Sequence, residues 1–195
     1  MKLRSLATVV ALVAASVATT AATPVPGTLA QELPVTLVMN AQSIGNSMPG
    51  QSRMTITITR WSDDAERQKI LGALIEMGPG AVRQTLQDLP EAGRVRVGQE
   101  NSYPIQYAFL QALEDGSYRL VVATDRDIDI WEQFYRTHTL DYNIALAELR
   151  IDADMTGEGV LAPGVMLGWN ADTNTVVIEN YDQQPVRLRS VRVEE

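Results

Sequence analysis

The feature that most constrains the fold is a strict alternation of apolar and polar residues between Arg53 and Arg60. Met54, Ile56 and Ile58 fall on one side of an extended chain, whereas threonines and arginine fall on the other. A period of two with one polar side is typical of a half-buried strand in an antiparallel sheet. The sequence therefore predicts a sheet that packs one face on a core and exposes the other to water.

Similar alternation recurs along the chain between short turns, which predicts about nine or ten strands. The Asp115-Gly116 pair has the chemistry of a tight hairpin turn. A slip in the alternation near Arg189 and Ser190 predicts a β-bulge in the last strand. Strands joined in this way form antiparallel meanders, and closure into a barrel or sandwich removes exposed edges. The expected strands cover about 35–40, 53–60, 94–98, 105–109, 118–122, 142–151, a partner from 159, 165–169, 175–180 and 186–193.

One early segment changes its period and predicts a helical hairpin. Asp63 and Glu66 have the spacing of a capping box, and Gly78 is a typical helix end. A second short helix stops before Pro90. We expect helices over about 63–77 and 80–89, inserted into an α+β fold that is mainly antiparallel β, a meander-type barrel or sandwich. We expect the helical pair to cap one end or one face of the sheet. The apolar residues that recur at helical spacing in the first helix are Ile70, Leu71, Leu74, Ile75 and Met77.

The N-terminal segment has the three-part layout of a secretory signal peptide. Lys2 and Arg4 precede an apolar run from Leu6 to Ala18, which is shorter than the roughly 20 residues of a membrane span. Cleavage is favoured after Ala30, with Ala22 as the alternative. We therefore expect residues 1–30 to be a signal peptide, residues 31–195 to form one domain, and the protein to be exported to the periplasm or the exterior.

Composition narrows the class of protein further. The chain has no cysteine, so no disulfide supports the exported domain and burial must hold it together. It contains 16 basic and 24 acidic residues, and removing Lys2 and Arg4 leaves 14 against 24, a mature charge of −10. An acidic balance argues against nucleic acid and against anionic membrane surfaces as partners.

No residue pattern defines a catalytic or metal centre. His138 is the single histidine, no cysteine can act as nucleophile, and no Gly-x-Ser-x-Gly turn is present. One histidine without cysteine also lacks the usual zinc ligands. The segment from Asp152 to Gly157 resembles the start of a calcium loop, but Pro163 occupies the place of the bidentate glutamate. We interpret it as a hairpin turn and expect neither metal nor cofactor.

Two sets of side chains are candidates for a site. A charged set could perform carboxylate-based acid–base chemistry, with solvated ion pairs as the alternative. Tryptophans near strand ends could rim a ligand cavity, with core packing as the alternative. The charged set is Asp125, Asp127, Asp141, Glu148 and Arg150, and the aromatic set is Trp61, Trp131 and Trp169.

Several short signatures together resemble a group of uncharacterised exported bacterial proteins of similar length. The likeness covers most of the mature region and implies export and a single domain, but it carries no functional residues. The signatures are Arg60-Trp61-Ser62, Ala123-Thr124-Asp125-Arg126, Leu140-Asp141-Tyr142, Glu148-Leu149-Arg150, Gly157-Glu158-Gly159, Glu179-Asn180-Tyr181 and Gln184-Pro185-Val186-Arg187-Leu188.

Three functions are consistent with the sequence. The first is a non-enzymatic binding module that holds a small apolar ligand, for which we expect an enclosed cavity. The second is an interaction or structural module whose partner is an envelope protein, for which we expect an exposed interaction patch. The third is a hydrolase with two carboxylates about 5 to 10 Å apart across a cleft. We rank them in this order, and the sequence does not specify the oligomeric state.

Overall fold

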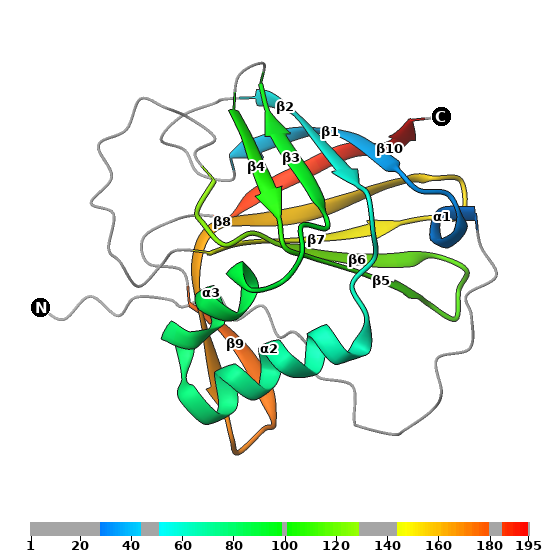
Figure 1. Ribbon diagram of the computed structural model, residues 1–195. Coiled ribbons are helices and arrows are strands. Elements are labelled where there is room, and N and C mark those ends of the chain that lie inside the picture. The colour runs from blue at the N-terminus through cyan, green and yellow to red at the C-terminus, as the bar shows by residue number, and fades with distance from the viewer. Residues whose placement is uncertain (1–27, 44–50, 99–100, 129–143, 180–184, 195) are drawn as a thin grey trace, which may run out of the picture.

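The computed structural model describes residues 28–43, 51–98, 101–128, 144–179 and 185–194. Within these ranges the chain forms one antiparallel sheet that curls into a nearly closed barrel, with a helical hairpin packed beside it (Figure 1). This confirms the expected α+β fold and decides between barrel and sandwich. The strands are β1 (Val35–Ser43), β2 (Gln51–Ile58), β3 (Gly93–Val97), β4 (Asn101–Ile105), β5 (Tyr107–Ala112), β6 (Tyr118–Ala123), β7 (Ile144–Ile151), β8 (Thr156–Asn170), β9 (Thr175–Glu179) and β10 (Val186–Glu194).

The barrel is an antiparallel meander in which the last strand returns to the first. The strand order is β4-β3-β2-β1-β10-β8-β7-β6-β5, so β10 lies between β1 and β8. The two end strands of this order, β4 and β5, are consecutive in the chain with only Gln106 between them. The two ends of the sheet are therefore joined by the chain itself. It pairs with β3 before Gln106, as β4, and with β6 after Gln106, as β5.

The barrel interior is filled by apolar side chains from every strand of this ring. The residues that set the sequence pattern, Met54, Ile56 and Ile58, are each 0% exposed, which confirms the predicted strand and its inward face. They pack with Leu37 and Met39 from β1 in one continuous cluster. Small barrels in which inward side chains meet across the axis have a packed core and not a pore. The largest fully buried side chains also include Leu86, Ile105, Leu120, Ile128, Leu149, Ile151 and Leu161.

The helical hairpin forms a second core on the outside of the barrel. Helices α2 (Asp64–Met77) and α3 (Pro79–Gln87) confirm the predicted pair, and the Asp63–Glu66 capping box is present. Their apolar side chains pack on residues of β5 and β7 and on the hairpin made by β9 and the second half of β8. Figure 1 shows this hairpin reaching beyond the barrel beside α2.

The apolar residues of α2 do not all contact the sheet. Leu74 is buried and Ile70 and Leu71 pack on the second core, but Ile75 and Met77 are 50% and 68% exposed. The helix contacts the sheet along a narrow stripe, and these two side chains fall beyond it near the helix end. Helical spacing alone does not reveal how wide the contact is.

Two strand predictions also needed correction. The segment 105–109 was expected as one strand, but the chain bends at Gln106 and forms β4 and β5. The segments from 159 and 165–169 were expected as separate strands, but both belong to the single long strand β8.

A short N-terminal helix, α1 (Thr28–Gln31), packs on the barrel core through Leu29, which is 3% exposed. The sequence pattern did not predict this contact, because the favoured cleavage after Ala30 would remove Leu29. Cleavage after Ala22 would keep it in the mature domain.

Candidate functional site

A groove lies on the outside of the barrel. It has a volume of about 750 Å³ and lies where the β7–β8 turn meets β10. The predicted bulge in β10 is confirmed: the register shifts between Leu188 and Val191, and Ser190 has a left-handed φ of 53°. A bulge bends its strand and re-aims side chains, and here it forms one wall of the groove.

The floor of the groove depends on a glycine. Gly157 in β8 lies opposite Ile151 of β7 and Val191 of β10. A Cβ atom at this position would clash with the backbone carbonyl oxygen of Arg150. Glycine therefore allows β7 and β8 to approach closely beneath the groove.

Both signs of charge line the groove. The Arg150 guanidinium binds the Asp115 carboxylate, and its Nε lies 3.9 Å from Asp152 Oδ1. Arg192 and Glu158 line the same groove but make no ion pair or hydrogen bond within the described residues. As far as the described residues go, the groove thus offers a ligand one cation, Arg192, and one carboxylate, Glu158, that no other side chain binds.

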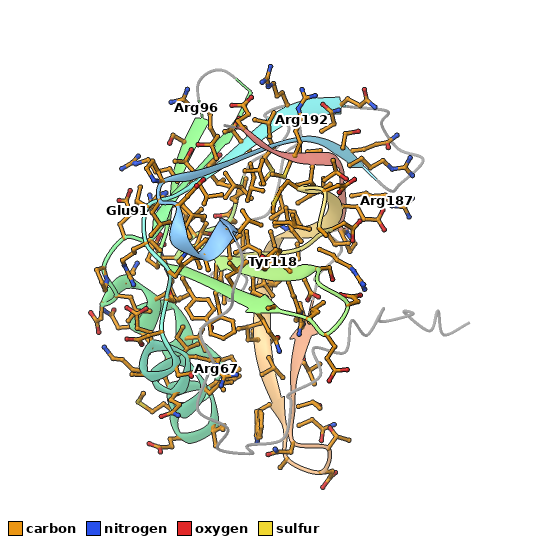
Figure 2. All side chains as sticks on the ribbon, turned by 90° about the vertical axis from the view of Figure 1, so that its right-hand side faces the viewer. Arg67, Glu91, Arg96, Tyr118, Arg187 and Arg192 are labelled. Carbon is orange, nitrogen blue, oxygen red and sulfur yellow. The ribbon has the colours of Figure 1, made fainter. Side chains whose placement is uncertain are left out.

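The groove opens onto an outer sheet surface rich in arginine. We call this surface the arginine face and define it by six exposed residues, Arg53, Arg94, Arg96, Arg187, Arg189 and Arg192. They lie on β2, β3 and β10. Strands β2 and β10 both pair with β1, and β3 pairs with β2. Figure 2 shows Arg96, Arg187 and Arg192 projecting away from the core, on the side of the molecule opposite Arg67 of α2.

Strand register brings these side chains together from distant parts of the chain. Arg96 lies opposite Thr55, Thr55 opposite Val38, and Val38 opposite Arg192. In a second row, Arg189 lies opposite Asn40, which pairs on its other side with Arg53. Alternate residues of a strand share a face, so all these arginines point outward.

Two of the six arginines have carboxylate partners. Arg53 contacts Glu194 at 3.3 Å and Arg94 contacts Glu91 at 3.0 Å. The other four, Arg96, Arg187, Arg189 and Arg192, make no ion pair within the described residues. The arginine face is therefore a local positive surface in a chain whose formal net charge is −8.

The four described members of the predicted charged set do not lie together in one site. Glu148 lies on the outer side of β7 and binds Arg119 through two contacts of 2.8 and 3.0 Å. Arg150 lies at the groove, and Asp125 follows β6 near the opposite end of β7. Asp127 also follows β6 and is half-buried, whereas Asp141 lies outside the described residues.

Asp125 has a structural setting, at the junction of the barrel and α3. Its carboxylate accepts from Gln87 Nε2 at 3.2 Å and Arg126 Nε at 3.1 Å, and its carbonyl oxygen accepts from Arg83 at 3.1 Å. Its N–H donates to Gln106 Oε1 at 3.0 Å, at the point where the barrel closes. Burial opposes ionisation most strongly, but the hydrogen bonds from Arg126 and Gln87 outweigh it and lower the pKa of Asp125 below its usual value.

The predicted tryptophans do not share a cavity in the described part of the chain. Trp61 packs against the barrel core, and Trp169 packs against the second core beneath the helices. Trp131 and His138 lie outside the described residues.

The segment from Asp152 to Gly157 is a hairpin turn between β7 and β8, as expected. Asp154 accepts hydrogen bonds from Thr156 Oγ1 and N at 2.7 and 3.1 Å, which lowers the pKa of its carboxyl. Over the ranges that the structure describes, no three histidine, cysteine or acidic residues form a group that could hold a metal ion.

The sequence analysis did not identify the arginine face. In the sequence, each of these arginines is only one polar position of an alternating strand. The β1–β10 and β2–β3 pairings bring them onto one surface. Among known proteins, no family model, curated protein or solved structure matches the chain. Of the helices in the described ranges, none is long and apolar enough to cross a membrane.

Proposed function

We propose that this chain is an exported, non-enzymatic interaction module that binds an anionic partner on the arginine face. The N-terminal pattern of Lys2, Arg4 and the apolar run to Ala18 supports export. The observation that carries the binding proposal is a set of four arginines on one outer surface that make no ion pair with any described residue, Arg96, Arg187, Arg189 and Arg192.

Electrostatics supports a binding role for this surface. Arginine recognises carboxylate and phosphate groups through a planar fork of donors and is more weakly hydrated than lysine. Within the described residues, many of the acidic side chains lie elsewhere, on α2 and in the hairpin turns. A positive surface on an otherwise acidic molecule attracts and orients an anionic partner.

The geometry favours this function over the other two that the sequence suggested. A small apolar ligand needs an enclosed cavity, but the barrel interior is filled by side chains such as Leu120 and Leu149. A hydrolase needs facing carboxylates, but Asp125 and Glu148 lie in separate places and each binds an arginine.

Retention on a sulfonated cation-exchange resin tests the proposal. At moderate ionic strength charges are screened over roughly 10 Å, so the resin senses the nearest face more than the net charge. We expect the mature protein to be retained despite its acidic composition. The double variant Arg96→Gln/Arg192→Gln should elute at clearly lower salt.

The matched control removes the same number of positive charges from α2. Arg67→Gln/Lys69→Gln lies on the helical side, and Arg67 is paired there with Asp64 at 3.1 Å. Its elution should stay close to that of the wild-type protein. Equal losses of retention in the two double variants, or no retention of the wild-type protein, would contradict the proposal.

A further inference from the structure

We propose that the anionic partner is an acidic polysaccharide, of the class in which sugar hydroxyls and carboxylates alternate along a chain, as in a polyuronate. This inference rests on the proposed function and adds the chemistry of the groove to it. The arginine face would bind the carboxylates of the polymer, and the groove beside Arg192 would bind its hydroxyl groups.

The first observation concerns the groove carboxylates. Glu158 and Asp152 line the groove together with Arg192, and Glu158 has no partner within the described residues. A bare polyanion, such as a phosphate polymer or an anionic lipid surface, would be repelled by these carboxylates. A sugar hydroxyl, in contrast, donates a hydrogen bond to a carboxylate and accepts one from an arginine.

The second observation concerns what the arginine face lacks. Protein interfaces have an apolar centre with aromatic anchors. The rows that cross this face contain Thr55 and Asn40 between the arginines, and Val38 is only 4% exposed. In the described part of the face there is no exposed aromatic side chain, so a polar polymer fits it better than a protein.

The third observation concerns continuity. Arg192 belongs to both the groove and the arginine face. It lines the groove, and on the arginine face it lies in the same cross-strand row as Arg96. A linear polymer seated in the groove can therefore continue across β10, β1 and β2 towards β3. Several weak contacts along one polymer add up in affinity without any deep pocket.

Equilibrium binding of the mature protein to three polymers tests the inference. The probes are polygalacturonate, inorganic polyphosphate, which has the charge but no hydroxyl groups, and neutral dextran. We expect binding to polygalacturonate and no binding to dextran. The Arg192→Gln variant should bind both anionic polymers about tenfold more weakly, since it loses a charge-assisted hydrogen bond.

The variant Glu158→Ala gives the decisive comparison, because its effect should have opposite signs on the two anionic polymers. Binding to polygalacturonate should weaken by about tenfold, through loss of a hydroxyl acceptor. Binding to polyphosphate should stay equal or become tighter, through loss of a repulsive charge. The matched control is Glu76→Ala, an exposed carboxylate on α2, which should leave binding to both polymers unchanged.

The outcomes separate this inference from the function on which it rests. If Glu158→Ala binds both anionic polymers as well as or better than the wild-type protein, the partner is a simple polyanion and the polysaccharide inference is wrong. Binding to dextran as strong as to polygalacturonate would also overturn it. If the wild-type protein binds neither anionic polymer, the proposed function itself is wrong.

Discussion

At the scale of single residues, the contacts of Asp125 give this candidate catalytic residue a structural role. It connects α3, through Gln87 and Arg83, to Gln106 at the point where the barrel closes. The sequence showed that Asp125 lies among many charges, but spacing along a chain does not reveal which charges meet. The structure assigns this carboxylate to the junction between barrel and helices.

Replacing Asp125 with asparagine should lower the free energy of unfolding at pH 7 by about 1 to 3 kcal/mol, because the buried carboxylate loses the charge that binds the half-exposed Arg126. The pKa of Asp125 is lowered in the folded state, so its stabilising effect is present above the unfolded pKa of about 3.9. That effect is lost as the pH falls through the folded pKa.

The difference between wild type and Asp125→Asn should therefore shrink below about pH 4. Chemical denaturation at pH 7 and pH 3 measures it. Asp172→Asn, in an exposed turn, is the control and should change stability little at either pH. A stability loss of equal size at both pH values would show that the charge of Asp125 does not contribute.

At the scale of secondary-structure elements, the alternation of apolar and polar residues predicted strands best where one face of the strand is exposed to solvent. Strand β2 was predicted with the correct inward face, since its threonines point to water. Strand β5 was harder to predict, because Ala108 packs into the barrel while Tyr107 and Phe109 pack under the helices. When both faces are buried, alternation does not distinguish them, and the bend at Gln106 leaves no trace in the pattern.

The register of β2 can be tested by a pair of neighbouring substitutions. Ile56→Asp should destabilise the domain by more than about 4 kcal/mol, because it buries an unpaired charge in the barrel. Thr57→Asp should change stability by no more than about 0.5 kcal/mol, because position 57 faces outward opposite Arg94. Thermal unfolding followed by circular dichroism measures both, and similar tolerance of the two changes would contradict this register.

At the scale of the whole molecule, the distribution of charge matters more than its sum. The excess of acidic residues, 24 against 16 basic ones, led to the expectation that nucleic acid and anionic membrane surfaces are not partners. The fold instead collects Arg96 from β3 and Arg187, Arg189 and Arg192 from β10 on one side. These strands are separated by about half of the chain, so composition could not predict a local positive surface. The filled interior and the arginine face together support the proposal that binding takes place on the outside of the barrel.

The most direct test is to locate binding on the folded protein. A two-dimensional ¹H–¹⁵N spectrum of the labelled mature protein, titrated with a short oligogalacturonate, reports the position of the ligand. We expect shifts in the amides of β3 and β10, in the groove around Gly157, and in the side-chain Nε–H of Arg96 and Arg192. Shifts concentrated in the barrel interior around Leu120, or on α2 and α3, would contradict a function that resides on the arginine face.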